Sequence, residues 1–479
     1  MTDGLVAGRL NKVRAELKET TERLGSAPLG RLLLSLSLPG MASMITMALY
    51  NIIDTFWVAR LGYQAIAALT VSLPYFILAV AIGVGTGVGV NALTSRRFGE
   101  GNIEATNHVA GQIFWLTGFA GVIFLVAAVF FSAPILIVSG ATSDIMDFAT
   151  QYLTIIGFGM PCLFFMIVAN NLLRGSGDAL RPMIFMIAGT VTNIILDPLL
   201  IFGLGPFPEM GVSGAALATV VSQLFSAGLC FYYIVIHGSI YRVKLAYLRP
   251  NLSILRDIYR VGFPSMIMQV TESVVFVLVN NVLSSFGSLS LAAVGIAIRI
   301  LDLAFMPIIG VSHGLLPIVG FNFGARAWKR LWRAVKLASG GIMLLMGVAT
   351  VVLELFAPQL IAIFNDAPEL MALAVPAMRI FLATLVILGP SVLFVTVFQG
   401  LSKGKTALIL ALVRQFVFCV PLLFILPRIW GVIGVWLAWS IADVLAFLVS
   451  GLWLFREYKI QQRTGAWSDV AVSEMGSGG

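Results

Sequence analysis

Charged residues and cysteines are scarce in this chain. Only 11% of the 479 residues are charged, whereas a typical soluble domain has about 25%. The three cysteines, Cys162, Cys230 and Cys419, all lie inside apolar runs. These scarcities exclude a soluble multidomain protein, a secreted disulfide scaffold and an acidic disordered chain. Hydrophobic residues make up 59% and the mean hydropathy is +0.99, which indicates a polytopic membrane protein.

Long apolar runs are abundant. A helix needs about 20 such residues to cross a bilayer. Twelve runs meet that length, at residues 33–58, 64–93, 109–135, 151–173, 181–204, 212–237, 264–286, 290–318, 336–358, 371–398, 405–427 and 431–456. They are continuous and too long to be the roughly ten-residue strands of a membrane β-barrel. Because lipid offers the backbone no hydrogen-bond partner, the sequence predicts an all-α polytopic membrane protein with twelve transmembrane helices.

The basic residues lie mostly on one side of these spans. Most of the 30 Lys and Arg fall in the N-terminal segment, the C-terminal tail and alternate loops, whereas only Arg60 and Arg428 fall in the opposite loops. The positive-inside rule then places both termini in the cytoplasm. We expect a multi-pass protein of the plasma (inner) membrane. The net charge of +8 therefore reflects the orientation of the spans in the membrane. It does not indicate a nucleic-acid partner, and we expect none.

The chain contains an internal repeat. A shift of 225 residues aligns the first two spans with the seventh and eighth, with 12 identities over residues 39–99. Six spans in each half enter the membrane in the same direction, so the two six-helix bundles are related by a pseudo-two-fold axis along the membrane normal. The expected parts are a cytoplasmic segment 1–32, a lobe 33–237, a cytoplasmic linker 238–262, a lobe 263–456 and a tail 457–479. Such an architecture favours a transporter.

Carboxylates inside the spans need an explanation, because each costs about 2.5–3.5 kcal/mol on insertion scales. Asp54 lies in the first span, and Asp197 lies in the fifth span one helical turn after Asn193. The repeat places Val279 and Val420 at the corresponding positions of the second half. This asymmetry favours a proton or cation site in the first half. The alternative is that one or both carboxylates only bond within the packed bundle or lie near the external end of the spans.

Other motifs are less specific. Glu272, eight residues after Pro264, either lines a cavity, takes part in coupling or is a structural carboxylate. Asp302 follows Arg299 by three residues, which favours an internal ion pair. Residues 399–406 end like a phosphate-binding loop but follow a long helix instead of a strand, so we expect no ATP binding. Without a nucleophile–base pair or a zinc-ligand set, the sequence indicates no enzyme.

Four motifs carry a family resemblance over residues 30–456. They are residues 49–55 (LYNIIDT), 174–178 (RGSGD), 193–198 (NIILDP) and 211–219 (GVSGAALAT). In this order, on a six-plus-six repeat, they make the chain similar to the multidrug and toxic compound extrusion (MATE) transporters. The chain resembles most the branch, found in archaea and many bacteria, that has an aspartate on the first helix.

The resemblance implies a cation-coupling network in the first lobe. Carried over by motif, its members are Tyr50, Asp54, Asn170, Asn193, Asp197 and Thr219. A bound Na⁺ would lie at Asp54, Asn193, Asp197 and Thr219. Met47 stands where some relatives have Gln. Glu272 matches a Glu of another branch, whose partner Asp on the tenth helix is missing from residues 371–398.

The resemblance also implies an activity. We expect export of cationic or amphipathic drugs and toxic organic cations, in exchange for inward H⁺ or Na⁺ and without a resident cofactor. Loading of the aspartates would let the first helix bend near Pro39 and release the drug. The expected partners are these small molecules and membrane lipid, and the expected state is a monomer. The alternative is a flippase for lipids or lipid-linked precursors from the same superfamily.

Overall fold

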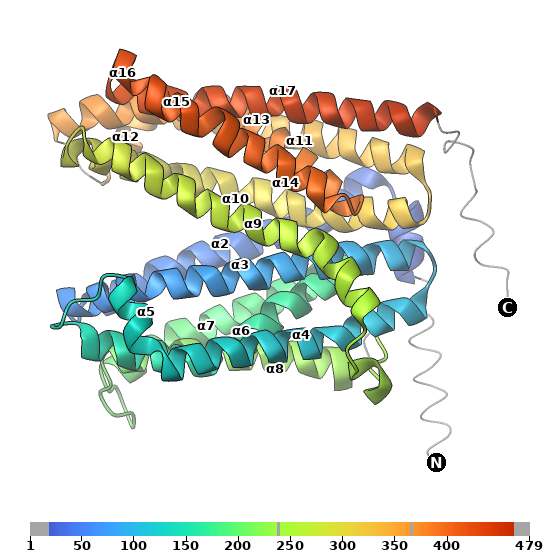
Figure 1. Ribbon diagram of the computed structural model, residues 1–479, viewed down its shortest axis with the longest axis horizontal. Helices are drawn as coiled ribbons and strands as arrows, with labels where there is room; N and C mark the ends of the chain where they lie inside the picture. Colours follow the sequence, from blue (N-terminus) through green and yellow to red (C-terminus); the bar gives the residue numbers. More distant parts are fainter. Residues whose placement is uncertain (1–18, 237–239, 365–366, 464–479) are drawn as a thin grey trace. The chain divides into compact units, whose positions relative to one another are not determined.

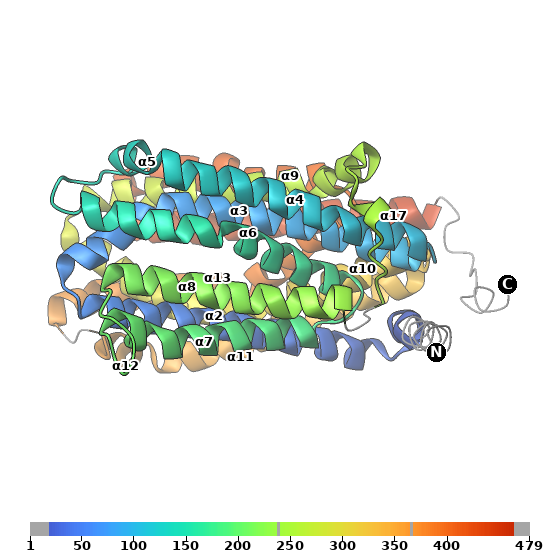
Figure 2. The same ribbon diagram turned by 90° about the horizontal axis from the view of Figure 1, so that it is seen from below.

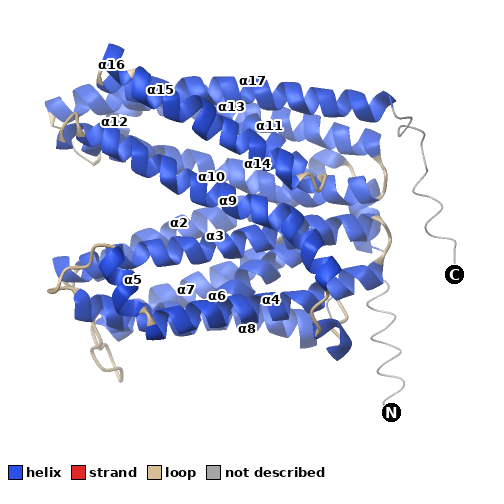
Figure 3. Ribbon diagram, viewed as in Figure 1, coloured by secondary structure: helices blue, strands red, loops and turns tan. Residues whose placement is uncertain are grey.

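The computed structural model describes residues 19–236, 240–364 and 367–463. Within these ranges every regular element is a helix (Figure 3). Twelve helices are long and apolar enough to cross a membrane. The expected all-α fold with twelve spans is confirmed.

The chain divides into two compact units. Among the described residues, the first contains 19–26 and Ala42–Gly262. Its elements are α2 (Leu29–Ala59) from Ala42 onward, α3 (Tyr63–Gly99), α4 (Ile103–Phe130), α5 (Ser132–Val138), α6 (Met146–Gly175), α7 (Leu180–Ile201), α8 (Val212–Phe231), the π-helical turn η1 (Tyr232–Ile236), the 3₁₀ turn η2 (Leu245–Leu248) and the start of α9 (Leu252–Ser284) (Figure 1).

The second unit contains Ala27–Met41 and the described residues from Phe263 to Arg463. It holds the start of α2, the rest of α9, and α10 (Ser288–Gly324), α11 (Trp328–Leu355), α12 (Ala357–Ala362), α13 (Pro368–Gly400), α14 (Gly404–Leu412), the π-helical segment η3 (Val413–Cys419), α15 (Val420–Ile425), α16 (Pro427–Trp430) and α17 (Val432–Arg463).

Two helices belong to both units, and each changes unit beside a proline. In α2 the change follows Met41, two residues after Pro39. In α9 it follows Gly262, two residues before Pro264. Proline inside a helix removes a backbone hydrogen bond and crowds the preceding turn, so it is a preferred site of bending. The repeated proline therefore lies where each helix passes from one unit to the other.

Glycines at equivalent positions of the repeat allow α3 and α10 to pack closely against the first segments of α9 and α2. In the first unit, a Cβ on Gly89 would collide with the carbonyl oxygen of Ile258 on α9. In the second unit, a Cβ on Gly314 would lie 2.5 Å from Ser37 Oγ on α2. Gly89 and Gly314 are equivalent in the repeat, and small residues allow such close approach of helices in membranes.

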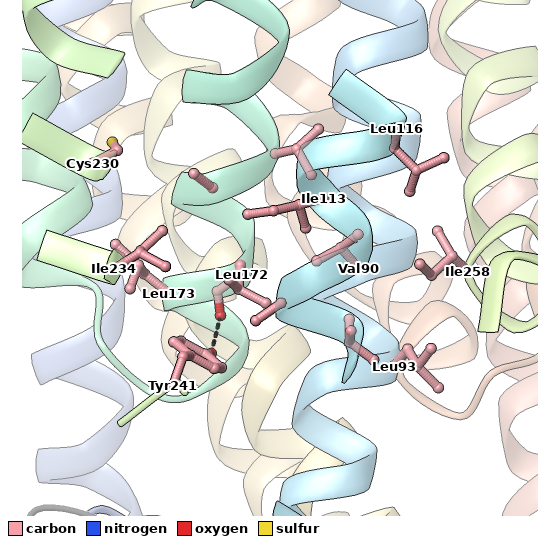
Figure 4. Packing of buried hydrophobic residues seen from close by; sticks show 14 residues of the cluster. Val90, Leu93, Ile113, Leu116, Leu172, Leu173, Cys230, Ile234, Tyr241 and Ile258 are labelled. Atoms are coloured by element: carbon pink, nitrogen blue, oxygen red, sulfur yellow. Dashed lines mark hydrogen bonds between the residues drawn. The ribbon is translucent and has the colours of Figure 1, made fainter. Parts of the chain in front are cut away.

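The linker packs against the first unit. Gln112 on α4 is fully buried, and its Nε2 donates to the carbonyl oxygens of Tyr247 and Arg249 at 2.8 and 2.7 Å. The Tyr241 hydroxyl donates to the Leu172 carbonyl oxygen at 2.8 Å, beside a cluster of buried apolar side chains (Figure 4). Burial raises the pKa of the Tyr241 phenol well above its usual value. The buried phenol therefore stays a neutral hydrogen-bond donor.

Helix ends extend beyond the predicted apolar spans. Helix α9 begins at Leu252, inside the stretch assigned to the linker, and α17 continues to Arg463. Hydropathy detects only the part of a helix that lies in lipid, whereas backbone hydrogen bonding continues past it. Residues 19–26 are also helical, with Leu24 buried against Gly177.

Candidate functional site

Three helices of the first unit bring the two carboxylates together. Asp54 lies on the second part of α2 and is half-buried, whereas Asp197 lies on α7 and is 0% exposed. Their charges are close enough to interact electrostatically. Helix α8 runs beside α7 and supplies Thr219 (Figure 2). Two nearby carboxylates in a buried site disfavour the doubly charged form, so the pair is suited to hold a proton or another cation.

Hydrogen bonds order the polar groups around the carboxylates. Asn193 Nδ2 donates to Asp197 Oδ1 at 3.2 Å, across one turn of α7. The Tyr50 and Thr219 hydroxyl oxygens lie 3.4 Å apart and join α2 to α8. The structure therefore brings together five of the six residues expected in the coupling network.

Two oxygens of this group remain without a partner. Within the described residues, Asp197 Oδ2 and Asn193 Oδ1 are buried and accept no hydrogen bond. Leaving a buried polar group unpaired is costly, and the cost is greater for a charge. A proton on the carboxylate or a small cation beside both oxygens would satisfy them. Carboxylate and amide oxygens are the hard ligands that such cations prefer.

Tyr152 on α6 is a further member of the site that the sequence analysis did not identify. It is close enough to Asp54, Tyr50 and Asp197 to interact electrostatically with each. The only sequence feature that marks Tyr152 is its hydroxyl group at the end of an apolar span. No polar neighbour at helical spacing marks it, so tertiary packing is needed to find it.

Asn170 lies apart from the carboxylates. Its Oδ1 is 3.5 Å from the Sγ of Cys230 on α8. On α6 it is five turns beyond Tyr152, a distance of about 27 Å at 1.5 Å per residue. The structure thus does not bring Asn170 to the other five residues expected in the network.

Met47 and Pro39 lie earlier on α2. Met47 is 41% exposed, one turn before Tyr50, in the first unit. Pro39 lies in the segment of α2 that belongs to the second unit.

Glu272 belongs to a different charged group, in the second unit. It is exposed on α9 and within electrostatic range of Arg414 in η3. Arg414 Nε pairs with Asp443 Oδ1 on α17 at 2.8 Å. Within the described residues, no group of three His, Cys, Asp or Glu gathers as a metal site.

The ion pair expected between Arg299 and Asp302 is not among those that the described residues form. The two side chains are both exposed on α10, and an ion pair between exposed side chains contributes little. Arg379 and Glu354 instead form an ion pair at 3.1 Å that the spacing along the chain does not suggest.

Comparisons with known proteins agree with this architecture. The family model MatE matches residues 39–199 and 264–425, one match in each half. The chain is 27% identical over 417 residues to the multidrug export protein MepA of Staphylococcus saprophyticus, covering 87% of this chain and 91% of that protein. It is 28% identical over 423 residues to a protein of Shewanella oneidensis named FAD transporter, covering 88% and 93%.

Solved structures give the same result. The crystal structure of a MATE protein in the bent conformation superposes with a TM-score of 0.88 at 29% identity, covering 93% of this chain and 99% of that one. An outward-facing multidrug resistance MATE transporter superposes with a TM-score of 0.87 at 28% identity, covering 92% and 98%. The expected family is confirmed: the chain belongs to the MATE family, whose members are membrane transporters and not enzymes.

Proposed function

We propose that this protein is a secondary active antiporter that exports cationic or amphipathic organic compounds in exchange for inward H⁺ or Na⁺. The observation that carries the proposal is the Asp54–Asp197 pair in one half of a duplicated scaffold, with an unsatisfied buried oxygen on Asp197 and another on Asn193. Val279 and Val420 stand at the repeat positions, so duplication alone does not account for the pair. The multidrug export names of relatives support the direction and the class of substrate.

The mechanism follows from the charge of the site. In the outward-facing state the carboxylates accept a proton or Na⁺ from outside, and this removes negative charge from a low-dielectric interior. The loaded site lets α2 repack, with a bend near Pro39, and the drug leaves outward. The cation then leaves inward, and each charge that enters contributes about 2.3 kcal/mol per 100 mV.

The setting of this mechanism is part of the proposal. The basic side of the spans faces the cytoplasm. Both termini and the 238–262 linker therefore lie on the cytoplasmic side of the plasma (inner) membrane. The protein works as a monomer surrounded by lipid. Its moving parts are the lobes 33–237 and 263–456. No resident cofactor is needed, because the ion gradient supplies the energy.

Transport in proteoliposomes tests this function. Purified protein is reconstituted with equal concentrations of ethidium inside and outside the vesicles, and net ethidium transport is measured first with an imposed pH gradient and then with an imposed Na⁺ gradient. At least one gradient should drive ethidium against its own gradient, and D54N should not support this transport. Equal leakage with and without both gradients contradicts antiport. A flippase for lipids or lipid-linked precursors would show no cation-driven drug flux.

A further inference from the structure

A line of buried polar side chains follows one face of α8. The four members recur at i, i+4, i+7 and i+11, a spacing that places them on the same side of a helix. They are Thr219, Gln223, Ser226 and Cys230, and they are 5%, 8%, 1% and 0% exposed. The line begins at the hydroxyl that meets Tyr50 and extends along α8 for about 16 Å at 1.5 Å per residue. It ends toward the side of the spans that carries most of the basic residues.

The neighbouring helices present polar groups to this line. Asn170 on α6 meets Cys230 at its far end. Ser226 Oγ donates to a backbone carbonyl oxygen of α7 at 2.9 Å. Near the middle, a Cβ on Gly159 of α6 would lie only 2.7 Å from Gln223 Oε1. The absence of a side chain at Gly159 therefore makes room for the Gln223 amide.

Gln223 is the observation that points to a ligand. Its Oε1 is buried and accepts no hydrogen bond from any described residue. An unpaired buried amide oxygen costs about 1–3 kcal/mol, and native proteins usually satisfy such groups with ordered water or an ion. Ser222, on the same helix, differs because its hydroxyl already donates to the Thr219 carbonyl oxygen at 2.8 Å.

The second half of the chain does not repeat this line of side chains. The repeat that aligns Gly211 with Gly431 places Asp443 opposite Gln223, and Asp443 is occupied by its ion pair with Arg414. The same alignment places the apolar Ala446 opposite Ser226. The line from Thr219 to Cys230 is thus specific to the half that contains Asp54 and Asp197.

We propose that this line is a hydrated release route, which carries the coupling cation from the Asp54–Asp197 pair to the basic side of the first unit. The route rests on the proposed antiport function. Gln223 is its central positioning residue, because its oxygen holds a water molecule or a passing Na⁺ between Thr219 and Ser226.

Drug flux and equilibrium drug binding together distinguish an effect on the release route from an effect on the Asp54–Asp197 site. Q223L removes the amide with little change in volume, and ion-driven drug flux in proteoliposomes should fall roughly tenfold. Drug affinity in detergent, and its response to the coupling cation, should stay within about twofold of the wild type, because Asp54 and Asp197 are unchanged. Q223N should recover most of the flux, and S222A should match the wild type. Wild-type flux in Q223L overturns the route, whereas absence of ion-driven flux in the wild type overturns the antiport function itself.

Cys230 reports on hydration without transport. In C162A/C419A it is the sole thiol, and Ag⁺, a soft monovalent cation, binds thiolates. The matched control adds C230A and places a thiol on the same helix with A218C, at a residue that is 0% exposed and off the line. Cys230 should react with Ag⁺ in nitrate buffer roughly ten times faster than the control thiol. Equal or slower reaction of Cys230 shows a dry core and overturns the route.

Discussion

At the scale of single residues, the two halves use charge differently. In the first unit, Asp197 keeps one oxygen free of any partner among the described residues, and Asp54 is its electrostatic neighbour. In the second unit, Asp443 is neutralised by Arg414. A free carboxylate can exchange its cation, whereas a buried ion pair loses several kcal/mol when it opens.

The carboxylates should differ in their effect on transport. We expect D54N and D197N to abolish drug resistance and ion-driven flux, because neutral amides do not change charge on loading. E272Q should be milder, since no Asp on the tenth span completes a second site. The measurement is drug resistance of cells with equal amounts of each variant in the membrane. Full activity in both Asp variants together with a null E272Q would move coupling to the second unit.

The Tyr50–Thr219 contact should tune affinity. T219V keeps the shape of the side chain and removes the hydroxyl that lies 3.4 Å from the Tyr50 oxygen. A hydrogen bond contributes about 0.5–1.5 kcal/mol, so cation affinity should fall by roughly two- to tenfold. Cation titration of purified protein, followed by the fluorescence of a bound drug, measures this change. An unchanged affinity would show that the hydroxyl does not contribute to the site.

At the scale of elements, close packing of helices depends on repeated glycines. G89A places a methyl group against the Ile258 carbonyl oxygen, and overpacking of this kind costs about 1–3 kcal/mol. Thermal unfolding in detergent should therefore begin at a lower temperature than in the wild type.

The matched control for this packing is G228A on α8, where a Cβ has no neighbour within 4 Å. There the gain in helix propensity, up to about 1 kcal/mol, should leave the unfolding temperature unchanged or higher. Equal unfolding of G89A and G228A would show that α3 and the start of α9 are not in tight contact.

At the scale of the whole molecule, the sequence predicts most of the fold and part of the site. Long apolar runs predict twelve spans because lipid leaves the backbone no other structure. The i,i+4 spacing predicts the bond between Asn193 and Asp197. Tyr152 and the Arg414–Asp443 pair escape such reasoning, because each depends on how separate helices pack.

The orientation of the molecule should follow its basic residues. In a variant without native cysteines, S143C should react with an impermeant thiol reagent added outside cells. S253C should react only after the membrane is opened, because the positive-inside rule places its side in the cytoplasm. Both side chains are exposed, so burial does not confound the comparison. The reversed pattern would contradict the assigned topology.

The central claim is that Asp54 and Asp197 link cation binding to drug binding. Equilibrium binding of a fluorescent organic cation in detergent, measured across pH and across Na⁺ concentration, tests it most directly. Linkage is reciprocal, so with a coupling of about 1–3 kcal/mol the drug dissociation constant should rise roughly 5–150-fold when the cation site is loaded. The double variant D54N/D197N should show almost no dependence on pH or Na⁺. If it kept the wild-type response, these two aspartates would not be the coupling site.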